Sequence, residues 1–283
     1  MIDKLPFAKF EGAGNDFVII DGRPGAPADG NDLSALAVAM CDRHYGIGAD
    51  GLLVASPVTA TARSEGALAH MRMHNPDGSE SEMCGNGLRC FARWLAEAGL
   101  LPSDDAVIET GAGLLRATLR PNGFVSATMG VPRVDEHALA LRPAVLEQSA
   151  TRVSMGNPHA VFFVPDVSAV PLSDIGPRIE HHAAFPSRTN VEFVQVLTEN
   201  RLRVRVWERG AGATLACGTG ACAAHVAARV QGIVSERTTL ELPGGELEVT
   251  WAGGESQAQL AGPAVRVFDG AWPLHPNNRA RSG

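Results

Sequence analysis

A cysteine motif that occurs twice constrains the fold of this chain more than any other feature. Cys84–Gly87 (CGNG) and Cys217–Gly220 (CGTG) each open a run with the residue pattern of a buried helix. At equal spacing before the two motifs a strand-like run ends on a polar residue, and at equal spacing after them comes a glycine turn. The polar residues are Asn75 and Glu208, and the turns contain Gly111 and Gly244. Features repeated in the same order predict two homologous halves.

A further match lies upstream, where Gly14-Asn15 and Gly156-Asn157 each lead into an apolar, strand-like run. We predict an α/β (α+β) protein of two pseudo-twofold-related halves, each a curled, mostly antiparallel sheet around a central helix. The expected domains are residues 1–130, which carry Cys84, and residues 131–283, which carry Cys217. We expect a last strand near residues 265–269 to cross back to the first half.

Composition excludes several classes of function. The chain has 283 residues, of which 45% are hydrophobic and 19% charged, as in ordinary globular proteins. A net charge of -7 argues against nucleic-acid and anionic-membrane surfaces, which need clustered basic charge. The N-terminus lacks the layout of a signal peptide, and no apolar run reaches the length of about 18 residues that spans a bilayer. We therefore expect a cytoplasmic protein; the oligomeric state stays open, with a homodimer as the candidate.

The five cysteines do not form a recognisable disulfide or zinc pattern. Their number is odd, and no CxxC pair or Cys/His cluster is present. We therefore expect no metal. Cys41, Cys90 and Cys222 fall within apolar helical runs and are expected in the core. Position alone singles out Cys84 and Cys217.

A cysteine at the start of a helix suits acid–base chemistry. Helix N-termini bind anions and lower the pKa of a cysteine from about 8.5 toward neutrality. In a duplicated fold, two such cysteines would face one gap, where a thiolate removes an α-proton and a thiol protonates the opposite face. The backbone amides that would hold the α-carboxylate are those of Gly85, Asn86, Gly218 and Thr219. The residues thus predict an amino-acid racemase or epimerase that needs no cofactor.

The motifs also resemble those of the diaminopimelate epimerase family, over nearly the whole chain and in family order. The resemblance implies interconversion of LL- and meso-diaminopimelate, in the biosynthesis of lysine and cell-wall precursors, without pyridoxal phosphate. The segments that carry it are Gly14–Phe17, Asn75–Glu80, Met83–Gly87, Gly156–His159, Arg188–Asn190, Trp207–Gly210 and Ala216–Gly220.

The resemblance also implies roles for individual residues. Cys217 would take the α-proton from the LL isomer, while Cys84 would protonate the opposite face. Glu208 would bind the ammonium at the reacting centre and, with His159, tune the pKa values of the cysteines. Some members carry Gln where this chain has Gly51, so that contact is absent or comes from backbone or water. The residues implied to hold the amino and carboxylate groups of the substrate are Asn15, Asn75, Asn157, Asn190 and Arg209.

Plainer interpretations exist for several of these residues. Each asparagine is near a turn, where Asn often serves only the local backbone. His159 alternates with Val161 along a strand, as a core histidine would. Glu208, in contrast, continues the apolar face of its strand, where a carboxylate without a partner is costly, so a cationic ligand group is expected.

Two other functions compete with this hypothesis. Proline racemases and hydroxyproline epimerases share a related plan with paired cysteines, but a cyclic imino acid has no use for so many polar groups. A redox-sensing module whose cysteines switch a partner is the alternative outside enzymology. Racemisation assays on a panel of amino acids would separate the three.

Overall fold

The computed structural model describes residues 4–139 and 149–274. The chain divides into two compact units, residues 1–127 together with 263–283, and residues 128–262. The final strand therefore belongs with the first unit. No helix in the described ranges is long and apolar enough to cross a membrane.

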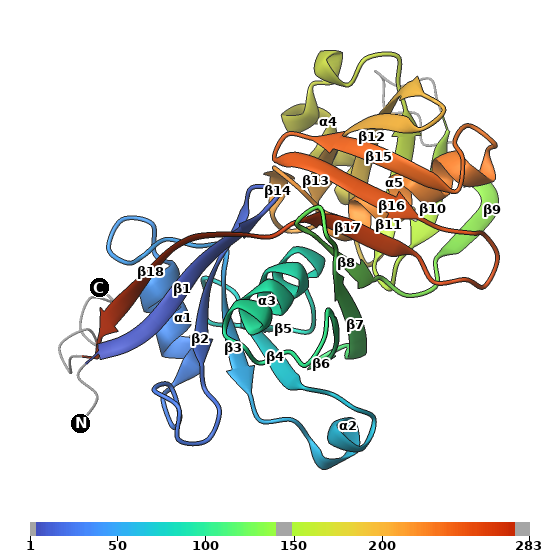
Figure 1. Cartoon of the computed structure of the whole chain (residues 1–283). Helices are drawn as coiled ribbons and strands as arrows, with labels where there is room; N and C mark the ends of the chain where they lie inside the picture. The colour runs from blue at the N-terminus through green and yellow to red at the C-terminus, as the bar shows by residue number, and fades with distance from the viewer. Residues whose placement is uncertain (1–3, 140–148, 275–283) are drawn as a thin grey trace. The chain divides into compact units, whose positions relative to one another are not determined.

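The first unit is a curled sheet that surrounds one long helix (Figure 1). Among its described residues, the helices are α1 (Leu33–Cys41), α2 (Ala60–Ser64) and α3 (Gly85–Glu97). Its strands are β1 (Lys4–Gly12), β2 (Asn15–Asp21), β3 (Gly51–Ser56), β4 (Ala69–His74), β5 (Glu80–Ser81), β6 (Asp105–Thr110), β7 (Gly113–Leu119), β8 (Phe124–Thr128) and β18 (Val265–Pro273).

The strands of this unit pair mostly antiparallel, in the spatial order β18-β1-β2-β3-β4-β6-β7-β8. The β2–β3 and β4–β6 pairs are parallel, because a connection with a helix joins the strands of each pair. The strand expected near residues 265–269 is β18, which is antiparallel to β1.

The second unit repeats this plan. Its helices are the 3-10 helix η1 (Val167–Ala169), α4 (Leu172–Glu180) and α5 (Gly218–Val230). Its strands are β9 (Arg133–Leu139), β10 (Ala150–Ser154), β11 (Pro158–Phe163), β12 (Asn190–Thr198), β13 (Arg201–Glu208), β14 (Gly212–Thr214), β15 (Arg237–Leu242), β16 (Gly245–Thr250) and β17 (Gln259–Pro263).

The topology of the second unit matches that of the first strand by strand. The spatial order is β9-β10-β11-β12-β13-β15-β16-β17, with β11–β12 and β13–β15 as the parallel pairs. α5 follows β14 just as α3 follows β5. The mixed α/β fold with a repeated unit, expected from the cysteine motifs, is therefore present.

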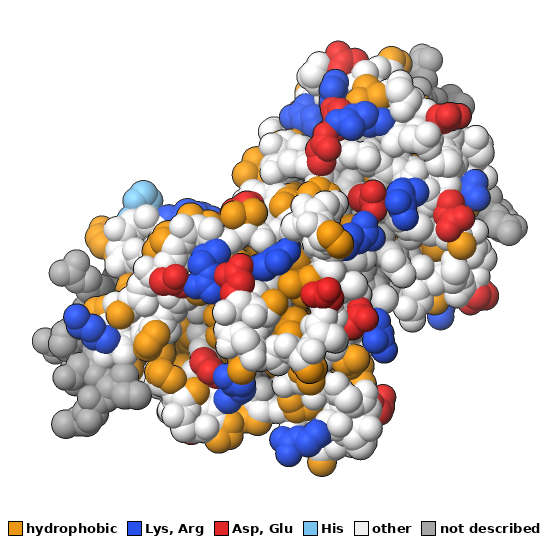
Figure 2. Space-filling model, in the orientation of Figure 1, with side chains coloured by type: hydrophobic (Ala, Val, Ile, Leu, Met, Phe, Trp, Pro, Cys, Tyr) orange, Lys and Arg blue, Asp and Glu red, His pale blue; other side chains and the backbone are white. Residues whose placement is uncertain are grey.

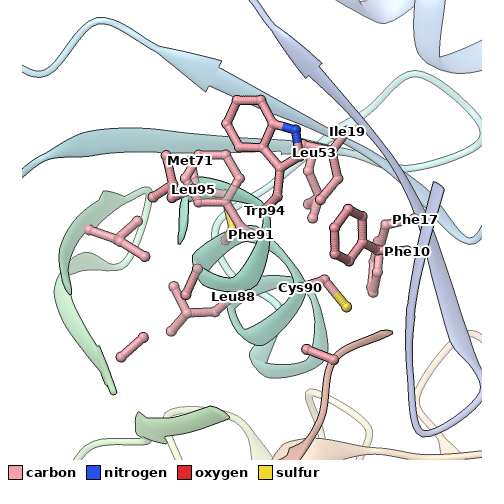
Figure 3. Close-up of a cluster of buried hydrophobic side chains, with 14 of the residues drawn as sticks. Phe10, Phe17, Ile19, Leu53, Met71, Leu88, Cys90, Phe91, Trp94 and Leu95 are labelled. Carbon is pink, nitrogen blue, oxygen red and sulfur yellow. The ribbon is translucent and has the colours of Figure 1, made fainter. Parts of the chain in front are cut away.

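α3 is the centre of the first hydrophobic core. Its residues Leu88, Phe91 and Leu95 belong to one buried cluster with strand residues that include Phe10 and Phe17 (Figure 3). Phe91 stacks on Trp94 with ring centroids 5.7 Å apart. Cys90 lies in the same cluster and is fully buried, as expected. This packing fixes the start of α3, where Cys84 is located.

α5 is buried on all sides, as its run of Ala and Val predicts. Cys222 lies inside it, fully buried, as expected. α4 covers the other face of the second sheet, where Phe162 stacks on Phe193 with centroids 5.6 Å apart. Small side chains let strands approach α5 closely, which leaves its first turn rigidly held.

The surface carries charges of both signs. On the face drawn in Figure 2, the Lys and Arg side chains are interspersed with Asp and Glu among the described residues. His181 and His182 are exposed after α4, as expected for a polar surface segment. This face offers no broad basic surface to a polyanion.

Candidate active site

Cys84 caps the N-terminus of α3. Its backbone is extended (φ −137°, ψ 120°), and its Sγ accepts a hydrogen bond from the Gly87 amide at 3.5 Å. A Cβ at position 87 would be 3.3 Å from Leu53 and 3.5 Å from the Cβ of Cys84, so glycine allows the close packing of this turn. The cysteine thus occupies the cap position predicted from the motif.

Asn15 connects Cys84 to a carboxylate. The amide oxygen of Asn15 accepts from Cys84 Sγ at 3.7 Å and from Asn86 Nδ2 at 3.2 Å. The amide nitrogen of Asn15 donates to Asp50 Oδ2 at 2.6 Å. Asp50 therefore sets the orientation of the amide and turns its oxygen toward Cys84. No pattern in the sequence marks Asp50, because its contact with Asn15 depends on how the strands pair.

A network of ion pairs holds this part of the unit together. Asp16 pairs with Lys9 at 2.6 Å and with Arg43 at 2.7 Å, and Arg43 also pairs with Asp50 at 2.6 Å. Burial alone would raise the pKa of Asp16, but the hydrogen bonds from Arg43 and Lys9 outweigh it and lower this pKa to about 2. The Gly-Asn-Asp motif therefore serves both the candidate site, through Asn15, and the stability of the fold, through Asp16.

Asn75 and Gly51 are the other positions of interest in this unit. Asn75 follows β4 and donates from its backbone and its Nδ2 to Ser79, at 2.8 and 2.9 Å, so it closes a turn. A Cβ at position 51 would be 3.1 Å from Met73 and 3.2 Å from the carbonyl oxygen of His74. The packing around Gly51 thus leaves little room for a larger side chain at this position.

Cys217 caps α5 in the same way as Cys84 caps α3. Its Sγ accepts from the Gly220 amide at 3.3 Å, and it lies 3.5 Å from Thr219 Oγ1. The residue is only 6% exposed.

A line of hydrogen bonds runs from Cys217 into the core of the second unit. Asn157 Nδ2 donates to Thr219 Oγ1 at 3.4 Å, and Asn157 Oδ1 lies 3.0 Å from His159 Nε2. His159 Nδ1 lies 2.7 Å from Glu192 Oε1, and both side chains are fully buried. The predicted residues Cys217, Thr219, Asn157 and His159 are therefore brought together, with Glu192 as an addition.

The pKa of Cys217 shifts in the direction opposite to the one expected from the helix N-terminus. Burial is the largest cause that raises the pKa of this thiol well above its usual value, followed by the nearby carboxyl groups of Glu208 and Glu192. The hydrogen bonds with Thr219 and Gly220 lower it but do not compensate. Burial and the neighbouring carboxyl groups thus favour the thiol form of Cys217.

Glu208, Asn190 and Arg209 gather around the turn after β13. Glu208 accepts from Thr214 Oγ1 at 2.5 Å. Asn190 Oδ1 accepts from the backbone amide of Arg209 at 2.9 Å, and its Nδ2 donates to the carbonyl of Pro158 at 3.0 Å. Arg209 is exposed, with its guanidinium donating to the carbonyl of Ser187 at 3.2 Å. Asn190 thus holds the turn that presents Glu208 and Arg209.

Glu180 in α4 clamps the same turn. It accepts from Trp207 Nε1 at 2.8 Å and from the Gly210 amide at 3.0 Å. A Cβ at Gly176 would be 2.5 Å from the Trp207 ring, so glycine lets α4 pack against this tryptophan. Nothing in the sequence pattern marks Glu180, because its role depends on how α4 packs.

The described ranges contain no group of three or more His, Cys, Asp or Glu side chains that could hold a metal ion.

The fold of this chain is shared by proteins of known structure. A PhzF-family protein from Bacillus anthracis shares it with a TM-score of 0.72 at 19% identity, covering 96% of this chain and 99% of that one. A hydroxyproline epimerase from Agrobacterium vitis, with bound trans-4-hydroxy-L-proline, shares it with a TM-score of 0.69 at 18% identity, covering 98% and 94%.

Comparison of the sequence with known proteins identifies the family as well as the fold. The family model described as diaminopimelate epimerase matches residues 7–134 and 151–267. Diaminopimelate epimerase 1 from Nostoc sp. is 48% identical over 283 residues, covering 94% of this chain and 99% of the relative. Diaminopimelate epimerase from Moorella thermoacetica is 45% identical, covering 95% and 100%. This chain belongs to the diaminopimelate epimerase family.

Proposed function

We propose that the protein epimerises LL-2,6-diaminopimelate to meso-diaminopimelate without a cofactor, with Cys217 as base and Cys84 as acid. The observation that carries this proposal is the matched placement of Cys84 and Cys217 as caps of the central helices, in a chain of this family. Cys84 is hydrogen-bonded to Asn15, and Cys217 is linked to Asn157 through Thr219.

The α-proton of an amino acid is a very weak acid, so its removal needs a strong base and stabilisation of the resulting charge. Backbone amides in the first turns of α3 and α5 are suited to bind the α-carboxylate, where negative charge accumulates. The residues concerned are Gly85, Asn86, Gly218 and Thr219. A second thiol protonates the opposite face, and the two exchange roles when the reaction reverses.

Glu208 couples substrate binding to activation of Cys217. The negative charge of Glu208 raises the pKa of the Cys217 thiol. A substrate ammonium beside Glu208 cancels that charge and so lowers the pKa of Cys217. The base forms when the amino acid that it will deprotonate is bound.

The distal amino-carboxylate end of the substrate is assigned to Arg209 and the asparagines Asn15, Asn75, Asn157 and Asn190. Arg209 has an exposed guanidinium, the group best suited to grip a carboxylate through two hydrogen bonds. A substrate that lacks the distal carboxylate loses this contact.

Substrate selectivity tests the proposed function. LL-diaminopimelate should turn over, whereas L-lysine, which lacks the distal carboxylate, should not. Replacing Arg209 by Met should weaken binding of LL-diaminopimelate by about 2–4 kcal/mol, because a desolvated carboxylate loses its partner. Polarimetry on both amino acids without pyridoxal phosphate gives the answer; comparable rates on lysine would refute the assignment.

We also propose a cytoplasmic location, since Cys41, Cys90 and Cys217 are free thiols, as is usual in a reducing compartment. We propose a homodimer as the oligomeric state.

A further inference from the structure

A buried carboxylate, Glu192, lies beneath the first turn of α5. Val191 and Phe193 pack on the α4 side of β12, so Glu192 between them points to α5. Its side chain has no solvent exposure, and its Oε1 is 2.8 Å from the place where a Cβ at Gly220 would be. Only glycine allows the helix start to lie this close to the carboxylate.

The first unit has the same arrangement without charged groups. In the first unit Phe17 pairs with Gly51, and in the second unit His159 pairs with Asn190, so Phe17 and His159 occupy equivalent positions. Two residues further along the second strand of each pair lie Leu53 and Glu192, which are therefore also equivalent. Leu53 lies beneath Gly87, 3.3 Å from the site of a Cβ there, and both Phe17 and Leu53 are fully buried.

The fold therefore does not need an acid and an imidazole at these two positions, because Phe and Leu fill them in the first unit. Burying a carboxylate and an imidazole costs more free energy than burying an apolar pair of similar size. A role in the chemistry of the second unit explains why His159 and Glu192 occur there.

The hydrogen bonds between Glu192 and Cys217 have a defined direction. An amide nitrogen only donates and an amide oxygen only accepts. Because Asn157 Oδ1 faces His159 Nε2, that nitrogen carries a hydrogen. Because Asn157 Nδ2 donates to Thr219 Oγ1, the hydroxyl hydrogen of Thr219 is free to be donated to Cys217 Sγ, 3.5 Å away.

Glu192 is at the end of this hydrogen-bonded line that lies farthest from Cys217, where it contacts His159 Nδ1. In the imidazole tautomer that carries its hydrogen on Nε2, His159 Nδ1 is an acceptor, and Glu192 Oε1 is then the donor across this 2.7 Å contact. Burial raises the pKa of Glu192, although His159 opposes the shift. Glu192 Oε2 has no hydrogen-bond partner among the described residues, which suits a neutral acid better than an anion.

We propose that Glu192 is a positioning residue for Cys217: it fixes the hydrogen on His159 and, through Asn157 and Thr219, keeps a hydroxyl donor aimed at Cys217 Sγ. A donor at that sulfur stabilises the thiolate. Its importance for turnover rests on the proposed function, in which Cys217 is the base.

Cys84 shows the opposite direction. Asp50 accepts from Asn15 Nδ2, so Asn15 Oδ1 faces Cys84 and accepts from its Sγ. An acceptor at the sulfur favours the thiol. Asp50 thus orients the Asn15 amide so that it favours the thiol of Cys84, and Glu192, through His159, orients the Asn157 amide so that it favours the thiolate of Cys217.

The test replaces Glu192 by the residue that the first unit uses, Glu192→Leu, which keeps the size and the burial. The rate at which iodoacetamide alkylates Cys217 is followed across pH in the full-length protein and resolved by peptide mass spectrometry. We expect the pKa of Cys217 to rise in this variant and alkylation at pH 8 to slow about tenfold, because the donor is no longer held.

Two companion variants separate this role from bulk and charge. Glu192→Gln keeps a donor for His159 Nδ1 and should alkylate within about threefold of wild type. Thr219→Val removes the hydroxyl that donates to Cys217 Sγ, so it should slow alkylation of Cys217 as much as Glu192→Leu does. The double variant with both changes should be alkylated no more slowly than either single variant. Cys84, in the other unit, is the internal control and should alkylate at an unchanged rate.

The charged and titratable groups that face this line are His159 from β11, Glu208 from β13 and Cys217 at the start of α5. If Glu192 acted only as a nearby anion, Glu192→Leu would lower the pKa of Cys217 and speed its alkylation. That result, or slowing that multiplies in the double variant, would overturn the proposal. Neither outcome depends on which amino acid is the substrate.

Discussion

Replacing either Cys84 or Cys217 by Ala should abolish epimerisation, with a fall in kcat of about 10³-fold or more. Each thiol handles the proton on one face of the α-carbon, so one cannot substitute for the other. Both variants should still bind LL-diaminopimelate, because the asparagines, Glu208 and Arg209 remain. Polarimetry for turnover and calorimetry for binding separate the two effects.

Cys90→Ala and Cys222→Ala are the matched controls, since each lies inside the helix that one of the two cysteines caps. Both side chains are fully buried, so the expected cost is about 1 kcal/mol of stability, with most activity retained. A Cys84→Ala enzyme that epimerises at near the wild-type rate would contradict the proposed roles.

Glu208→Gln should change the resting thiol and the turnover in opposite ways. Loss of the negative charge lowers the pKa of Cys217, so alkylation of the free enzyme at pH 8 becomes faster. Loss of the partner for the substrate ammonium costs about 3 kcal/mol, so kcat/KM falls about a hundredfold. The pH profile of alkylation should move to lower pH.

Glu241→Gln is the control for this change. Glu241 also lies on a strand of the second unit, but it pairs with Arg201 and Arg203 at the surface. It should leave both the alkylation of Cys217 and kcat/KM unchanged. Slower alkylation in Glu208→Gln would show that Glu208 does not hold Cys217 in the thiol form.

Much of the fold could be predicted because the same pattern of residues occurs twice in the sequence, so each half supports the interpretation of the other. Similar spacing around Cys84 and Cys217 required equivalent strands on either side, and the two units have the same strand order. The run of Ala and Val after Cys217 predicted a helix buried on all sides, which is what α5 is. Patterns of this kind are visible because burial and helix periodicity act locally along the chain.

The residues behind the site could not be predicted, because strand pairing and helix packing bring them together. Asp50 reaches Asn15 only because β3 lies beside β2, and Glu180 reaches Trp207 only because α4 packs on β13. In the sequence, Glu192 is one polar residue in an apolar strand, and nothing there indicates that it contacts His159. The pKa of Cys217 followed burial and nearby carboxylates rather than the helix N-terminus, and neither is apparent from the CGTG motif.

The most direct test of two bases acting on opposite faces is the fate of the α-hydrogen in D₂O. Starting from LL-diaminopimelate, meso product formed in the first turnovers should carry deuterium at the inverted centre, while unreacted substrate gains little. The reason is that the hydrogen taken by Cys217 is not the one delivered by Cys84. Mass spectrometry of product and substrate at low conversion measures both. Product that retains its original hydrogen would mean that a single base serves both faces and would contradict the roles assigned to Cys84 and Cys217.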